Sequence, residues 1–483
     1  MMSFFLLLLA LQGTPQPGGG ASLRPAADSV PLSLPDAIGR AIRTGDEARA
    51  AAAQVDVTDA QVTIARAAGL PQLRVQANQS HVFESARAAA VGQIFNQPNT
   101  YTANAQLSQS LFQGGRIVAA SRAASNLRNA SRFDETETLA GVAVDVQRAY
   151  LQALFAGRLA EIQDSALALA GERLAQVQQF ERAGRASRYD VLRASVERAN
   201  LQPAVIQARS EVELALVELR RLTNLPSTQP IQLTTRLDAA EVIRWVTALR
   251  ADSGTLNRAA IRSAEMTASA RRAGVRVARA DLLPTVSITG TLGGQAFPQG
   301  GIPTRAGRIE TVDCPAGSDE GRVCTAQNGG WFRDKSFGIS IGLPIFDGLR
   351  AKGAIDLASA QARLADLQLR QTRERVESEA AASRAELDRA EALFSVQGEN
   401  ATQAEEAFRL ASLRYTRGLA TQLEVADAQL ALTVARTNRA RSVYDLYLAA
   451  ASYARALGRQ PHLFEIPNSP RIALPPSANS ARE

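Results

Sequence analysis

Two patterns of apolar and polar residues alternate along this chain. In four short segments, every second side chain is apolar, which predicts strands with one apolar face and one face of small polar residues. Strands of this kind lie between two different media. The apolar positions are Leu73, Val75 and Ala77; Tyr101, Ala103, Ala105 and Leu107; Val286, Ile288 and Leu292; and Phe337, Ile339, Ile341, Leu343 and Ile345.

After each pair of strand segments, the apolar spacing changes to three and four residues, which predicts a helix. The two helices are expected from Gly115 to about Ala183 and from about Leu349 to Thr416. A helix of about 68 residues is roughly 100 Å long. Each ends at a glycine that can adopt the left-handed turn conformation. These glycines are Gly184 and Gly418, and returning helices are predicted at 187–222 and 421–457.

The chain follows the same plan twice. Phe112-Gln113-Gly114 is repeated 234 positions later as Phe346-Asp347-Gly348, and Gly418 follows Gly184 by the same offset. Two distant landmarks with one offset indicate an internal duplication. We therefore expect one repeat at 32–225, a second at 239–458 and a short extended tail at 459–483. The tip that joins the second pair of strands carries about 21 additional residues.

The chain begins with an apolar run, Met1–Leu11, that is too short to cross a bilayer and is typical of a secretory signal peptide. We expect the signal to end near residue 21, although no Lys or Arg precedes the run. No cysteine follows it closely, so no lipid anchor is expected. Because no later segment reaches about 18 consecutive apolar residues, no transmembrane helix is predicted.

The composition adds little chemistry to this picture. The net charge of +7 comes almost wholly from arginines scattered among acidic residues, which indicates solvated helix faces rather than a surface for nucleic acid. The two histidines, His81 and His462, are far apart in sequence. No phosphate loop, metal-ligand cluster or nucleophile–base set is visible. We therefore expect no enzyme activity, no cofactor and no metal.

The two cysteines, Cys314 and Cys324, lie close together in the long tip of the second strand pair. In an exported chain, two nearby cysteines favour a disulfide over a metal-binding pair. Closing so short a loop contributes about 2–3 kcal/mol in the chain-entropy model. The bond would restrain a loop that has no core of its own.

Four strands cannot close a barrel, and an apolar strand face cannot stay in water. Strands in a bilayer must close so that no edge is left unpaired. Three chains of four strands give twelve, an even number of the kind that such barrels use. The helices are too polar for lipid and too long for a compact domain, so we expect them to pack as a second tube in water. The alternative is a long coiled-coil protein in which the strand segments are loops.

From residue 32 to residue 458 the chain resembles the TolC family of outer-membrane efflux proteins. Single marks of this resemblance are weak, but their order and doubled spacing are specific. They are Leu-Ser-Leu-Pro-Asp-Ala-Ile at 32–38, Ala-Gly-Leu-Pro at 68–71, Gln-Ser-Leu-Phe-Gln-Gly-Gly at 109–115, Leu283-Pro284, Leu-Pro-Ile-Phe-Asp-Gly at 343–348, and both glycine turns.

The resemblance implies a fold that is mainly α, with long antiparallel helical hairpins in an α-barrel tunnel and a twelve-stranded barrel completed by a homotrimer. It implies an exit duct of a tripartite efflux pump or a type I secretion system in the outer membrane of a Gram-negative bacterium, with a long periplasmic extension. The implied partners are a periplasmic adaptor and an inner-membrane transporter. A passive porin-like channel is the alternative, although a porin needs no long helices. A periplasmic adaptor is a third hypothesis, but it would carry one hairpin rather than two.

In this family, the glycine turns lie at the periplasmic tip, where the adaptor docks and the tunnel closes. The closure uses polar bonds between neighbouring helices and rings of carboxylates. By resemblance, the docking tip is Gly184 and Arg185 with Gly418 and Leu419; the bonding pair is Asp190 and Tyr415; and the acidic rings are Glu424 and Asp427. For each of these, the alternative is an ordinary helix stop or a solvated helix surface.

One position departs from the family pattern. The best-studied members place an Arg two residues after the second glycine, where this chain has Ala420. Arg417, just before Gly418, is the available substitute. The spacing of Glu424 and Asp427 places both carboxylates on one helix face. Three copies of each around one axis would repel one another and favour the entry of cations.

Overall fold

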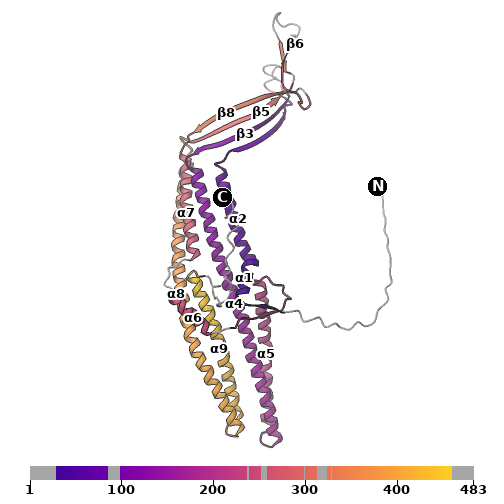
Figure 1. The fold of residues 1–483 in the computed structure, drawn as a ribbon, viewed down its shortest axis with the longest axis vertical. Helices are drawn as coiled ribbons and strands as arrows, with labels where there is room; N and C mark the ends of the chain where they lie inside the picture. Colours follow the sequence, from indigo (N-terminus) through magenta and orange to yellow (C-terminus); the bar gives the residue numbers. More distant parts are fainter. Residues whose placement is uncertain are drawn as a thin grey trace, which may run out of the picture.

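The computed structural model describes residues 29–84, 98–236, 239–251, 258–298, 300–312, 324–327 and 329–459. The chain is long and narrow, with a curved sheet at one end and two helical tips at the other (Figure 1). The expected signal peptide lies outside the described residues, and so does all of the expected tail except Arg459.

Four strands form one antiparallel sheet in the order β2-β3-β5-β8. They are β2 (Gln72–His81), β3 (Asn99–Gln113), β5 (Thr285–Ala296) and β8 (Trp331–Gly342). The sequence predicted all four. In the described part of the chain, the outer edges of β2 and β8 have no strand partner.

The sheet has one apolar face, and this face is uncovered. Val75, Ala105 and Leu292 lie in one row across β2, β3 and β5 because they are directly opposed in the ladders. On β8 the face continues with Phe337, which is 72% exposed, and with Ile339 and Ile341. The opposite face carries small polar side chains, such as the hydrogen-bonded pair Ser287 and Ser340.

The predicted position of β8 was wrong at both ends. The strand begins at Trp331 and ends at Gly342, so Leu343 and Ile345 lie beyond it. Phe346 therefore does not close a strand, whereas its counterpart Phe112 lies inside β3. The physical reason at the downstream end is Pro344, which has no N–H to donate to a ladder.

The helices form two long hairpins of equal dimensions. Helices α4 (Arg116–Arg182) and α8 (Arg350–Thr416) have 67 residues each, and the returning helices α5 (Arg188–Leu222) and α9 (Gln422–Ala456) have 35 each. Both pairs are related by the offset of 234 that the glycines predicted. The elements before the second tip are related by 213 instead, as for β2 and β5, so the additional 21 residues lie between β5 and α8.

Shorter helices extend the hairpins toward the sheet. Helix α1 (Leu34–Thr44) begins after Ser33, whose side chain caps it as predicted. Helix α2 (Asp46–Ala67) packs on α4, and α7 (Ala259–Arg279) packs on α4 and α8. A 3-10 turn, η2 (Ala280–Leu282), then leads into β5.

A belt crosses the hairpins midway along the molecule (Figure 1). Here β1 (Val30–Leu32) pairs in parallel with β4 (Ile231–Leu233), and α6 (Ala239–Ala251) packs on α9. The buried Tyr150 of α4 fastens the belt, because its hydroxyl donates to the Leu32 carbonyl at 2.8 Å and accepts from the Thr235 N–H at 3.2 Å. Two apolar clusters of buried residues lie at this level, so the belt contains a hydrophobic core.

The long tip of the second strand pair contains two further strands that the sequence did not predict. Strands β6 (Ile309–Val312) and β7 (Cys324–Gln327) form an antiparallel hairpin. The predicted disulfide remains a prediction, because Cys314 lies outside the described residues.

Candidate functional site

Both long helices end in the same glycine turn, at the end of the molecule farthest from the sheet (Figure 1). Gly184 has φ 70° and Gly418 has φ 77°, the left-handed conformation that glycine adopts without penalty. The N–H that follows each glycine closes the turn: Arg185 donates to the Phe180 carbonyl at 2.7 Å, and Leu419 donates to the Arg414 carbonyl at 2.8 Å. These bonds satisfy carbonyls that the helix end would otherwise leave without partners.

Both returning helices begin with a capping box. Ser187 and Asp190 cap α5, where the Asp190 carboxylate accepts from the Ser187 N–H at 2.9 Å and from its hydroxyl at 2.7 Å. Thr421 and Glu424 cap α9 in the same way, and the Thr421 N–H donates to Glu424 at 3.2 Å. Asp190 and Glu424 are thus equivalent positions of the duplication, although the family resemblance implied different roles for them. The spacing Ser/Thr-x-x-Asp/Glu is the sequence signal from which both capping boxes could have been predicted.

The side chain of Asp190 is ionised more readily than an ordinary aspartate. Hydrogen bonds from the Ser187 side chain and then from its backbone hold the pKa of Asp190 below its usual value, because they favour the charged form. Glu424 has a different second partner, since Arg414 lies 3.6 Å from its carboxylate. Arg414 also donates to the Leu419 carbonyl at 3.2 Å, so it braces the second turn.

Tyr415 lies where the two hairpins approach each other. Its ring is 6.0 Å from that of Phe180 on α4, with the planes tilted by 48°. Burial raises the pKa of the Tyr415 phenol, and the nearby Asp190 carboxylate raises it further. The predicted pair is therefore close within one chain, but no hydrogen bond joins the two side chains among the described residues.

Two arginines complete this end of the hairpins. The Arg185 guanidinium lies 4.4 Å from the centre of the Phe180 ring, a cation–π contact that connects one turn to the contact between hairpins. Arg173 of α4 is buried, lies 3.9 Å from Glu197 of α5 and interacts with Tyr415. Arg173 cannot be recognised from the sequence, because nothing in its spacing separates it from the many surface arginines.

The two acidic residues of the predicted rings, Glu424 and Asp427, lie one helical turn apart on α9, and both are exposed. Their role in a gate stays a prediction. Arg417 is the C-cap of α8, and its backbone N–H donates to the Leu413 carbonyl at 3.3 Å. Leu419 is 66% exposed, so an apolar side chain projects from the second turn.

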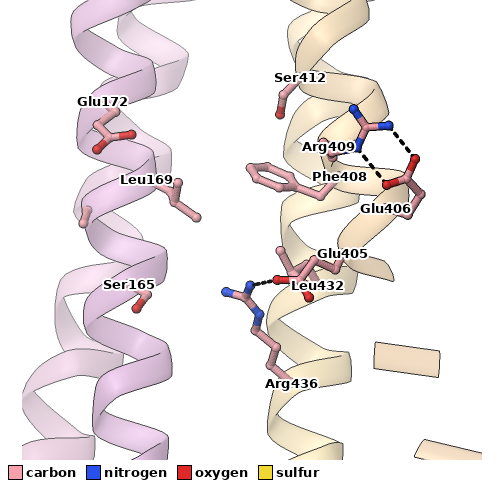
Figure 2. Close-up of a pocket in the computed structure, with 11 residues that line it drawn as sticks. Ser165, Leu169, Glu172, Glu405, Glu406, Phe408, Arg409, Ser412, Leu432 and Arg436 are labelled. Carbon is pink, nitrogen blue, oxygen red and sulfur yellow. Dashed lines mark hydrogen bonds and ion pairs between the residues drawn. The ribbon is translucent and has the colours of Figure 1, made fainter. Parts of the chain in front are cut away.

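A solvent-open cleft of about 640 Å³ separates the two hairpins at a level closer to the belt than the glycine turns are (Figure 2). Ser165, Leu169 and Glu172 of α4 line one wall. The other wall carries two ion pairs, Arg409 with Glu406 and Arg436 with Glu405. The two ion pairs are each neutral, whereas Glu172 on the facing wall has no ion-pair partner among the described residues, so this mainly apolar cleft carries one net negative charge.

The described residues hold no cluster of acidic, histidine or cysteine side chains that could bind a metal ion. Among them, too, no helix combines the length and the apolar character that a membrane crossing requires.

Comparison with known proteins places this geometry in context. The sequence profile of the outer membrane efflux protein family matches residues 38–225 and 253–459. The chain is 23% identical over 433 residues to the outer membrane efflux protein BepC of Brucella suis, an alignment that covers 88% of this chain and 85% of that protein.

Solved structures with the same fold include two outer-membrane proteins. VceC, an outer membrane protein of Vibrio cholerae, has a TM-score of 0.69 at 20% identity, covering 89% of this chain and 97% of that one. The open-state MtrE outer membrane channel of Neisseria gonorrhoeae has a TM-score of 0.67 at 21% identity, covering 88% and 89%. At these identities the likeness shows the fold.

Proposed function

The chain belongs to the outer membrane efflux protein family, and from this membership we propose that it is the exit duct of a tripartite efflux pump or a type I secretion system. It is an efflux channel of the Gram-negative outer membrane with long periplasmic helices. The proposal concerns what completes it: two further copies, a periplasmic adaptor and an inner-membrane transporter.

The observation that carries the proposal is the open sheet. Its apolar face is uncovered and its edge strands β2 and β8 lack partners in the described chain. In a bilayer each unpaired backbone group costs several kcal/mol, so the edges must pair with other copies. Three chains give a closed barrel of twelve strands, and six helical hairpins then surround one tunnel.

The gate of this duct is proposed at the helical tips. Three copies of Glu424 and Asp427 would supply six carboxylates around the axis, while Asp190 and Tyr415 would hold neighbouring hairpins together. The exposed position of the two acidic side chains within one chain supports this assignment. The docking surface for the adaptor would be the turns themselves, with Arg185 and Leu419 beside their glycines.

The test is single-channel conductance of the purified protein in a planar bilayer, for wild type and for Glu424→Gln/Asp427→Asn. Glutamine keeps the capping bond of Glu424 and removes its charge, so the helix start is preserved. The matched control is Glu405→Gln/Glu406→Gln, which removes two carboxylates from the cleft wall.

We expect small cation-selective currents from wild type and from the control, and a loss of selectivity in the tip variant. Selectivity that survives in the tip variant would reject these gate residues and keep the duct. Failure of a folded trimer to insert would reject the duct itself. A passive porin-like channel would instead give large currents that no tip substitution alters.

Adaptor docking needs a separate experiment, in which the duct and the periplasmic adaptor of its host are produced together. Cross-linking yield is compared between wild type and Leu419→Ser, with Leu430→Ser as the control, because Leu430 is equally exposed on α9 away from the turn. Loss of cross-links in the first variant alone supports docking at the turns. Equal yields in all three proteins would move the docking surface elsewhere.

A further inference from the structure

The apolar face of the sheet carries two positive side chains near the end farthest from the helices. Successive residues of a strand point to opposite faces, so Arg333 and Lys335 share the face of Phe337, Ile339 and Ile341. Asp334, between them in sequence, points to the polar face and cannot pair with either on the same side.

The cross-strand rows contain no carboxylate. Lys335 is opposite Leu292 and continues the row of Val75, Ala105 and Leu292. Arg333 is opposite Gly294 and continues the row of Ala77, Ala103 and Gly294. Both cations are exposed, and within the described part of the chain neither forms an ion pair.

The next row outward is aromatic. It contains Trp331 on β8 and Tyr101 on β3, which share this face with Ala296 between them. The Trp331 indole donates to the Pro303 carbonyl at 2.8 Å, which fixes its polar end toward the tip. Tryptophan and tyrosine concentrate where hydrocarbon meets headgroups, so this row marks the level of the membrane interface.

The energetic cost of a cation that faces lipid also indicates a position near the membrane interface. Arg or Lys on the lipid face of a barrel strongly destabilises it at the midplane and has little effect near the interface. Arg333 and Lys335 lie one and two rows on the membrane side of the aromatic row, so their long side chains must extend outward to bring both charges to headgroup level. Because the helices extend into the periplasm, the opposite end of the sheet faces the exterior, and the headgroups there belong to the outer leaflet.

We propose that Arg333 and Lys335 bind the phosphate groups of an outer-leaflet lipid headgroup, with one site on each protomer. The guanidinium of Arg333 presents two parallel donors that match phosphate oxygens, and the Lys335 ammonium adds a mobile point charge. The apolar rows below receive the acyl chains. This inference rests on the proposed trimeric barrel, because only a closed barrel turns this face toward lipid.

The experiment is native mass spectrometry of the detergent-solubilised trimer titrated with lipid A, a glucosamine lipid that carries two phosphates. The variant is Arg333→Gln/Lys335→Gln. The control is Arg74→Gln, because Arg74 is a cation of the same sheet on its opposite, polar face. A second variant, Arg333→Lys/Lys335→Arg, keeps both charges.

Wild type, the control and the charge-keeping variant should bind up to three lipids per trimer. The glutamine variant should bind at least tenfold more weakly, and added salt should weaken the wild type toward the same level. Equal binding by the glutamine variant would overturn the proposal, and so would equal displacement by inorganic phosphate at matched phosphate concentration, which would indicate a general anion site.

The readouts separate this inference from the function on which it rests. If wild type forms no trimer or does not insert in a bilayer, the duct fails and the lipid site fails with it. If the glutamine variant forms trimers with normal conductance and still binds lipid A as wild type does, only the lipid site is rejected. Wild-type trimers that conduct normally but bind no lipid A lead to the same rejection.

Discussion

At the scale of single residues, the ends of the hairpins reuse the same chemistry at equivalent positions. Asp190 and Glu424 each accept hydrogen bonds from the residue that caps their helix. The same carboxylates are the ones the family resemblance placed in the gate. A capping carboxylate has a fixed position, so it can present its charge toward an axis without further support. Alanine substitutions would therefore mix two effects, loss of the cap and loss of the charge.

The glycine turns allow a direct prediction. Gly418→Ala should lower the free energy of unfolding by about 1–2 kcal/mol, because a side chain with φ near 77° strains the backbone even though the surrounding space is empty. Gly353→Ala is the control at an exposed glycine in the first turn of α8, where alanine should stabilise by up to about 0.5–1 kcal/mol. Denaturant unfolding of the purified trimers measures both. Equal effects of the two substitutions would contradict the role of the turn.

The capping carboxylate of α5 predicts a pH dependence. The folded-state pKa of Asp190 is depressed, so its contribution is present above the unfolded-state pKa of about 3.9 and is lost as the pH falls through the folded-state value. Between about pH 5 and 3, wild type should therefore lose stability more steeply than Asp190→Asn. Chemical denaturation at several pH values measures the two slopes.

The donor residue supplies the control for this prediction. Ser187→Ala removes the hydroxyl that bonds Asp190 and should flatten the slope in part, with a cost of about 0.5–2 kcal/mol at neutral pH for the lost cap. Slopes that are identical in wild type and in both variants would show that Asp190 does not contribute.

At the scale of elements, the sequence predicted those whose signals are local. Helices α4, α5, α8 and α9 follow from apolar spacing and glycine stops, to within one or two residues. Strand β8 was displaced because Arg333, Asp334 and Lys335 interrupt the apolar alternation at its start. Strands β1 and β4 were missed because each has three residues and their pairing joins positions about 200 apart. The contact of Tyr415 with Phe180 likewise depends on how two hairpins pack, which no local pattern encodes.

A buried charge network joins four helices on the side of the belt that is nearer the sheet. Arg258, which is 5% exposed and precedes α7, bonds Glu137 of α4 at 2.8 Å and Glu379 of α8 at 2.6 Å. Arg455 of α9 approaches the same Glu137 at 3.5 Å. Burial alone would raise the pKa of Glu137, but the two arginines outweigh it and hold the pKa below its usual value.

This network predicts a large effect of one substitution. Arg258→Met should destabilise the protein by about 3 kcal/mol, because it leaves a partly buried carboxylate without its main partner. Arg258→Met/Glu137→Gln should recover part of that loss. The control Arg389→Met removes an exposed pair with Glu386 on α8 and should cost less than about 1 kcal/mol. Similar unfolding free energies for the two single variants would contradict the importance of burial.

At the scale of the whole molecule, the chain is incomplete by itself. The belt provides a buried core for the hairpins, but the sheet has no covering layer and no partner for its edges in the described chain. In the proposed trimer, rotational symmetry would supply the missing neighbours, because each β8 would pair with the β2 of the next copy. Such a closure would turn the apolar face toward lipid and the polar face inward.

Closure of the proposed barrel predicts which disulfide-linked oligomers can form. The native cysteines are first removed by Cys314→Ser and Cys324→Ser. Each variant then carries one new cysteine in β2 and one in β8, at a series of paired positions, and is oxidised in membranes. A closed ring of three should yield dimers and trimers on a denaturing gel and no larger species, because the third bond returns to the first chain. The control pair Ala105→Cys/Leu292→Cys is directly opposed within one chain and should yield only monomers. Ladders that continue beyond the trimer would mean an open sheet or a larger ring, and either result would overturn the twelve-stranded barrel.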